Sequence, residues 1–196
     1  SIENHALMAV KTALDMRHRL RQFNLSRPHE TQLKIGVGIS SGEVVSGNIG
    51  SQKRMDYTVI GDGVNLSSRL EAITKQYGCD IILSEFTYQL CSDYILVRDL
   101  DKVRVKGKQK AVSIYELIGA NSQPIDLETE EFLEFYVKGR QAYMNKEFSQ
   151  AISYFELAQK IRPEDKAVAI HVQRSRDYIK TPPPNDWDGI YTMTTK

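Results

Sequence analysis

The feature that most constrains the fold is a change of pattern near Gly119. Before it, helical and strand-like stretches alternate, whereas only helical periodicity is found from Phe132 to about Lys180. Three prolines at 182–184 then stop the helical pattern, because proline cannot continue a helix. We therefore expect a mixed α and β part over residues 1–120, a polar linker over 121–131, and a helical segment with a tail over 132–196.

The first part predicts one long helix, several short strands and a second helix. Residues 4–24 place apolar side chains three or four positions apart, which is typical of an amphipathic helix. A turn at Ser41–Gly42 is expected to fold the second strand back on the first, and residues 51–57 form a polar excursion. A helix is expected from about Gly63 to Gln76, ending at Gly78. The predicted strands cover 33–40, 43–50, 58–61, 80–85, 94–105 and 111–119.

Composition excludes several classes of protein. Of the 196 residues, 41% are hydrophobic and 26% charged, and the net charge is +1, so nothing indicates a nucleic-acid partner. Two cysteines, Cys79 and Cys91, are too few for a disulfide framework and lack metal-binding spacing. They indicate a reducing compartment, and the chain has no apolar run of about 18 residues that would span a membrane. We therefore expect a cytoplasmic protein without a membrane span.

The stretch TVIGDGVNLSSR, residues 58–69, reads as a strand running into a helix. A helix N-terminus offers unpaired N–H groups and partial positive charge, which suit a phosphate. Gly61 and Gly63 permit a sharp turn, and Asp62 is placed to cap the helix. Asn65 and Arg69 lie four positions apart and share one face, where a guanidinium can hold a phosphate and an amide can orient a sugar. From spacing alone, a capped helix with a solvated polar face is an equal alternative.

The stretch GISSGEVVSGNIGSQKRMDYTVIGDGVNLSSRLEA, followed by VRVKGK, closely resembles the C-terminal half of class III nucleotidyl cyclase catalytic domains. The resemblance covers roughly residues 4–119. It implies an α+β fold, a ferredoxin-like antiparallel sheet with packed helices, in which two domains join head to tail and form active sites at their interface. It also implies that Arg69 stabilises charge on the α-phosphate, that Asn65 positions the ribose for in-line attack by its 3′-hydroxyl, and that Lys106 contacts the terminal phosphates.

The resemblance also bears on the base. The purine-selecting position of the family falls on Thr58, seven residues before Asn65. Adenylate-forming members carry Asp or Thr there, so Thr58 favours ATP, with the backbone at Ile60 assisting, although a strand threonine is also explained by β-propensity. The function expected is an adenylate cyclase that converts ATP to 3′,5′-cyclic AMP and pyrophosphate. A guanylate cyclase is the alternative.

The sequence departs from the family pattern at the metal site. Family members carry two aspartates that hold two divalent metals, and a purine-binding lysine, and none of these motifs is present. We expect the ligands of two Mg²⁺ or Mn²⁺ ions per site in an N-terminal segment that the chain lacks, and hence a homodimer or a complementing cyclase half as partner. Asp99 and Asp101 are expected on a solvated strand face. The absent aspartates favour a non-catalytic nucleotide-binding or scaffold domain, whereas the intact Asn65, Arg69 and Lys106 oppose it.

The helical segment carries small and aromatic residues at the spacing of a tetratricopeptide repeat, whose period is about 34 residues. Small residues let paired helices approach, Phe155 fills the gap between them, and Pro163 ends the second helix. One repeat plus a third helix is too short for an array, so we expect this segment to pack on the first part or to begin an interaction module. A plain helical hairpin is the alternative, and the polar tail is expected to dock through Trp187. The repeat positions are Gly139, Ala151, Phe155, Ala158 and Pro163.

Overall fold

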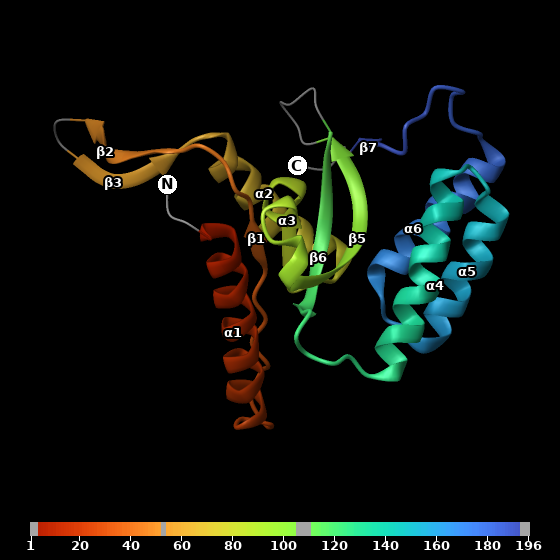
Figure 1. The fold of residues 1–196 in the computed structure, drawn as a ribbon, viewed down its shortest axis with the longest axis horizontal. Helices are drawn as coiled ribbons and strands as arrows, with labels where there is room; N and C mark the ends of the chain where they lie inside the picture. Colours follow the sequence, from red (N-terminus) through yellow and green to blue (C-terminus); the bar gives the residue numbers. More distant parts are fainter. Residues whose placement is uncertain (1–3, 52–53, 105–110, 193–196) are drawn as a thin grey trace.

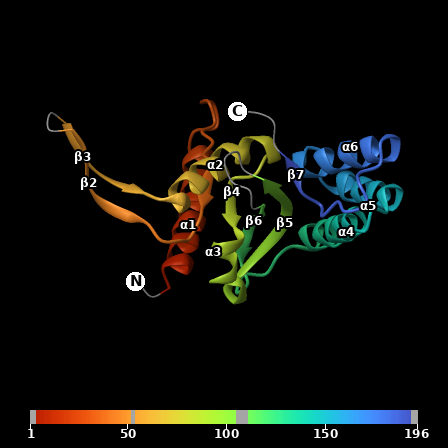
Figure 2. The same cartoon turned by 90° about the horizontal axis from the view of Figure 1, so that it is seen from above.

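The computed structural model describes residues 4–51, 54–104 and 111–192 (Figure 1). A central sheet lies between the N-terminal helix and a bundle formed by the C-terminal helices. A two-stranded hairpin projects from the body in both views (Figures 1 and 2). No helix in these three ranges is long and apolar enough to cross a membrane.

The order of the elements follows the sequence pattern closely. The helices are α1 (His5–Leu25), α2 (Asp62–Tyr77), α3 (Glu85–Gln89), α4 (Leu127–Met144), α5 (Phe148–Ile161) and α6 (Lys166–Lys180), with a 3-10 turn at Ser92–Tyr94. The strands are β1 (Val37–Ile39), β2 (Val45–Ser51), β3 (Arg54–Ile60), β4 (Ile81–Ser84), β5 (Ile95–Arg104), β6 (Val112–Ala120) and β7 (Tyr191–Thr192).

The sheet is mixed, with strand order β1-β4-β6-β5-β7. β1 pairs with β4 in parallel and β7 pairs with β5 in parallel, while the β4–β6 and β5–β6 pairs are antiparallel, so the prediction of a wholly antiparallel sheet is wrong. β1 lies tightly against α2, because a Cβ at Gly38 would collide with the backbone of Ser67 and Glu71.

The hairpin forms a separate two-stranded sheet of β2 and β3, in which Val45 lies opposite Ile60. The prediction that a turn at Ser41–Gly42 folds the second strand back on the first is therefore wrong, because β2 pairs with β3 and not with β1. β3 begins at Arg54, inside the stretch 51–57 that was expected to be a polar excursion. Cross-strand pairing with β2 holds this polar stretch in extended form.

Each face of the main sheet carries its own hydrophobic core. On one face, α1 packs through Ala6, Val10 and Ala13 against β4 and β6. On the other face, α2 and the C-terminal helices pack in one continuous core, which includes Ile82 of β4 and Leu100 of β5. The C-terminal segment therefore packs on the first part of the chain, which was one of its two expected roles.

The ends of the C-terminal segment follow local signals. α4 begins five residues before Phe132, within the stretch 121–131 expected as linker, because the Asp126 side chain accepts a hydrogen bond from the Thr129 backbone N–H at 2.6 Å and caps the helix. α6 ends before the prolines. The tail docks as expected, with the Trp187 ring centroid 5.3 Å from that of Tyr143 and 5.2 Å from that of Tyr178.

Candidate functional site

The candidate site is centred on the junction between β3 and α2. Gly61 has φ 154° and ψ 166°, and a Cβ there would lie 3.1 Å from the Glu43 carbonyl oxygen, so only glycine fits this turn. Gly61 is the N-cap, and Asp62 is the first helical residue, so the prediction that Asp62 caps the helix is wrong. A carboxylate in the first turn is still favourable, because the helix N-terminus carries partial positive charge. Gly63 lies inside the helix and is not needed for the turn.

The exposed side of α2 presents the predicted Asn65 and Arg69. The adjacent side of the helix buries Leu66, Leu70 and neighbours further along α2, which fixes the rotation of α2 against the sheet. Asn65 is exposed and Arg69 is partly exposed, and neither side chain makes a hydrogen bond or ion pair with another described residue. Both polar groups are therefore available to a ligand in the structure.

The predicted base-reading residues lie just before the turn. Thr58 is opposite Gly47 in the hairpin and is partly buried, whereas Ile60 is 51% exposed. Their side chains lie on the same side of β3, because residues two apart in a strand share a face. Four of the five predicted site residues are thus carried by the two elements that join at Gly61. The fifth, Lys106, lies outside the described residues, two positions after the end of β5.

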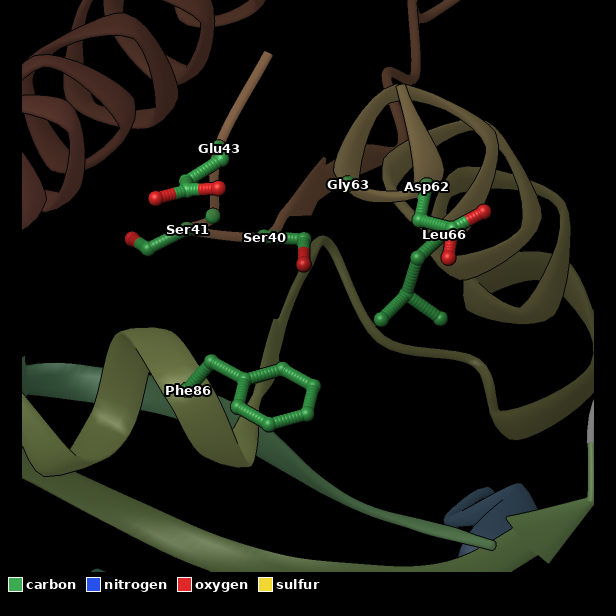
Figure 3. A pocket seen from close by; sticks show the side chains of 8 residues that line it. Ser40, Ser41, Glu43, Asp62, Gly63, Leu66 and Phe86 are labelled. Atoms are coloured by element: carbon green, nitrogen blue, oxygen red, sulfur yellow. The ribbon is translucent and has the colours of Figure 1, made fainter. Parts of the chain in front are cut away.

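A cavity of about 520 Å³ opens beside the first turn of α2, and Figure 3 shows Leu66 and Phe86 pointing into it from α2 and α3. Among the described residues, its lining includes two carboxylates, Glu43 and Asp62, and no cationic side chain. The Asn65 and Arg69 side chains are better suited to phosphate. The described residues that line the cavity are Ser40, Ser41, Gly42, Glu43, Asp62, Gly63, Leu66 and Phe86.

Several residues of this cavity were not singled out in the sequence. The parallel pairing of β1 and β4 sets Ile39 opposite Leu83, so the segments that follow both strands leave the same edge of the sheet. Ser40 and Phe86 come to the cavity from these two segments. Recognising from the sequence that the strands at 33–40 and 80–85 pair in parallel would have pointed to these residues, since ligands of α/β sheets bind beyond the carboxyl ends of parallel strands.

Class III cyclases generally use divalent metals. Within residues 4–51, 54–104 and 111–192, no group of three or more His, Cys, Asp or Glu side chains is arranged to hold a metal ion. This part of the chain therefore does not by itself supply a cluster of three or more side-chain ligands for such a centre.

Asp101 is the largest departure from the sequence-based expectation. It is fully buried, while the Asp99 side chain is 49% exposed, so a solvated face is correct for Asp99 alone. An irregularity between Asp99 and Asp101 in the pairing of β5 with β6 breaks the alternation and turns Asp101 inward. Burial alone would raise the pKa of the Asp101 carboxyl, but the adjacent Arg174 and Arg140 guanidinium groups hold that pKa below its ordinary value.

Comparisons with known sequences identify a family that matches most of this chain. Residues 1–119 match the family described as "Adenylate and Guanylate cyclase catalytic domain". The chain is 36% identical over 179 residues to "Adenylate cyclase, terminal-differentiation specific" of Dictyostelium discoideum, a match that covers 90% of this chain and 8% of that protein. It is 41% identical over 116 residues to an adenylate cyclase of Anabaena cylindrica, covering 58% of this chain and 23% of the relative. The chain thus spans less than a quarter of either relative.

Solved structures show the same likeness. The adenylyl cyclase CyaB from P. aeruginosa superposes with a TM-score of 0.52 at 33% identity, covering 61% of this chain and 62% of that one. The guanylyl cyclase Cya2 superposes with a TM-score of 0.54 at 35% identity, covering 62% of each chain. The structural likeness therefore includes one protein named an adenylyl cyclase and one named a guanylyl cyclase. The Dictyostelium match is also long enough to reach well beyond residue 119, into the C-terminal helices.

Proposed function

Because the chain belongs to the class III adenylate and guanylate cyclase family, we propose that it supplies the ribose- and phosphate-binding side of an adenylate cyclase site. One observation carries this proposal: Asn65 and Arg69 project from one side of α2, immediately after the glycine turn, with no side-chain partner among the described residues. A helix start with a guanidinium and an amide one turn apart suits a sugar phosphate.

The proposed reaction is an intramolecular phosphoryl transfer. The ribose 3′-oxygen bonds to the α-phosphorus of ATP, the bond from that phosphorus to the pyrophosphate oxygen breaks, and the hydroxyl proton is released. Asn65 holds the ribose so that the 3′-oxygen faces the phosphorus, and Arg69 stabilises the charge that develops on the α-phosphate. Lys106 contacts the departing pyrophosphate.

The adenine preference rests on Thr58. Its partly buried hydroxyl lies on β3 three positions before the glycine turn, with the exposed Ile60 between them supplying backbone groups to the base. The names of the Dictyostelium and Anabaena relatives support ATP, while the likeness to Cya2 makes GTP the alternative.

The projecting hairpin supports a dimer. Val45, Met55 and Tyr57 are 65%, 63% and 75% exposed, so the hairpin presents large apolar side chains to solvent. An isolated two-stranded hairpin is only marginally stable in water, and exposed apolar patches mark interaction sites. A second copy, or a complementing cyclase half, covers this surface in our proposal and contributes the ligands of the divalent metals.

The C-terminal helices are proposed to be tetratricopeptide-like. Ala151, Phe155 and Ala158 of α5 are fully buried, and Gly139 of α4 lies against the Phe155 ring. This contact between a small residue and an aromatic ring supports the tetratricopeptide-like proposal. Here the pair packs on the cyclase sheet through a shared core instead of stacking on further repeats.

The test is turnover by the complete protein with MgATP or MgGTP at equal concentration. We expect cyclic AMP to form faster than cyclic GMP, and Arg69→Ala to lower the rate about 100-fold or more, as loss of a charge-stabilising donor does elsewhere. Lys75→Ala, on the same helix, is the control and should leave the rate unchanged. Faster turnover of GTP would identify a guanylate cyclase. Nucleotide binding without turnover of either nucleotide would favour the scaffold alternative.

A further inference from the structure

A buried ionic cluster joins the C-terminal helices to the cyclase part. The Tyr77 hydroxyl donates a hydrogen bond to Asp101 Oδ2 at 2.6 Å, and Arg174 Nη1 forms an ion pair with the same carboxylate oxygen. Arg174 Nη2 also donates to the Tyr77 hydroxyl oxygen at 3.3 Å. The three residues are 1%, 0% and 7% exposed, so the cluster is shielded from water.

Such a cluster specifies geometry more than it adds stability. Burying charges carries a desolvation cost that apolar side chains of similar volume would avoid. In return, a planar guanidinium and a carboxylate with a shared hydroxyl are satisfied in only one arrangement. Here that arrangement fixes three elements at once, since Tyr77 ends α2, Asp101 lies on β5 and Arg174 lies on α6.

Two of these elements carry the proposed site. Arg69 lies eight residues before Tyr77 on the same helix, which is about 12 Å at 1.5 Å per residue. β5 ends at Arg104, three residues after Asp101, and Lys106 follows Arg104 by two positions in the sequence. A rotation or slide of α2 at Tyr77 would therefore move Asn65 and Arg69 relative to β5.

We propose that Tyr77, Asp101 and Arg174 are positioning residues, through which the C-terminal helices set the orientation of α2 against β5. This inference rests on the proposed function, because it assigns the consequence to Asn65 and Arg69. Turnover is sensitive to such an effect, since a misplacement of about 1 Å can cost about 100-fold in rate.

A second anchor provides a contrast within the same interface. Arg98 of β5 pairs with Glu116 of β6 at 2.6 Å and with Asp165, the N-cap of α6, at 2.8 Å. This anchor holds α6 on the sheet without involving α2. Loss of the Tyr77 hydroxyl alone should therefore leave the C-terminal helices docked while it loosens α2.

The experiment compares two removals of a buried tyrosine hydroxyl in the complete protein. Tyr77→Phe deletes the hydrogen bond to Asp101 and keeps the ring and the Asp101–Arg174 ion pair. Tyr143→Phe is the matched control, because its buried hydroxyl has no hydrogen-bond partner among the described residues. We expect Tyr77→Phe to lower kcat about tenfold or more with KM for MgATP changed less than about twofold, and Tyr143→Phe to change neither.

Arg69→Ala, measured alongside, separates the two proposals. If Arg69→Ala keeps full turnover, the proposed function is wrong. If Arg69→Ala abolishes turnover and Tyr77→Phe behaves like Tyr143→Phe, the positioning role is overturned. A second measurement is independent of activity: in ¹H–¹⁵N spectra of the 196-residue chain, Tyr77→Phe should shift the Asn65 and Arg69 amides. Unchanged amides at both positions would also overturn the inference.

Discussion

Gly139 of α4 faces the ring of Phe155 of α5 so closely that a Cβ at position 139 would lie 2.7 Å from ring atom Cε1. The Phe155 ring stacks on His171 with centroids 5.3 Å apart and meets Tyr136 edge-on at 5.7 Å. The three C-terminal helices therefore converge on one fully buried aromatic ring, and the absent side chain at Gly139 is what admits it.

The first prediction concerns this ring. Phe155→Ala should lower the free energy of unfolding by about 3–5 kcal/mol, because it leaves a cavity among side chains that cannot fully collapse. Urea denaturation followed by circular dichroism measures the change. Phe23→Ala, at a position 43% exposed on α1, is the control and should cost less than about 1 kcal/mol. Equal losses for the two variants would contradict the packing described.

The second prediction concerns pH. His171 is fully buried, its Nε2 lies 2.8 Å from the Leu100 carbonyl oxygen, and burial lowers the pKa of His171 to about 3. A histidine in the unfolded chain has a pKa of about 6.5, so below that pH the unfolded state binds a proton that the folded state does not. This contribution to stability is therefore complete above pH 6.5 and is lost progressively toward pH 3. About 2 kcal/mol should be lost by pH 5.

Urea unfolding at pH 7.5 and pH 5 tests this dependence. The glutamine of His171→Gln does not titrate in this range. Between pH 7.5 and pH 5, the free energy of unfolding should therefore fall by about 2 kcal/mol less in this variant than in the unchanged chain. His29→Gln removes an exposed histidine and should keep the full dependence. The same loss of stability in His171→Gln and in the unchanged chain would contradict the prediction.

The third prediction concerns the boundary near residue 120. A chain ending at Ala120 loses the partners of Asp101 on α6 and exposes Tyr77 and Leu100, which are buried in the shared core. Removing one partner of a buried ion pair typically costs about 3–5 kcal/mol, in addition to the lost apolar burial. We expect the shortened chain to show no cooperative unfolding transition, whereas a chain ending at Thr181 keeps α6 and unfolds cooperatively. A cooperatively folded 1–120 would show that the two parts are independent.

Local signals in the sequence account for much of the candidate site. The four-residue spacing predicts that Asn65 and Arg69 share one face of α2, and the structure leaves both at least partly exposed. Gly78 lies where the glycine pattern predicts the C-terminal end of α2, whereas the start of α2 lies one residue before the Gly63 start that the sequence predicts. These features depend on neighbours within one or two turns, and hence they can be read from the sequence alone.

Features that depend on distant partners could not be predicted in this way. Asp101 reads as exposed because strand alternation pairs it with Asp99, and only the irregularity in β5 and the presence of Arg174, 73 positions away, make its burial favourable. The parallel pairing of β1 with β4 likewise depends on α2, which forms the crossover connection between them. The apolar residues of β1 are compatible with parallel or antiparallel pairing, so the sequence of the strand does not decide between them.

The last prediction is a complementation. The described residues contain no group of three or more His, Cys, Asp or Glu side chains that could hold a metal ion, and family resemblance places the metal-binding aspartates on one protomer and the Asn–Arg pair on the other. The 196-residue chain by itself should therefore give no cyclic AMP with MgATP, even when folded. Mixing it with a polypeptide that carries the aspartate-bearing segment, and has Ala in place of its own counterpart of Arg69, should restore turnover. Arg69→Ala in this chain should abolish the restored rate, and Lys75→Ala should not. Strong turnover by the unmixed chain, with its mass confirmed, would show that the metal ligands lie within residues 1–196.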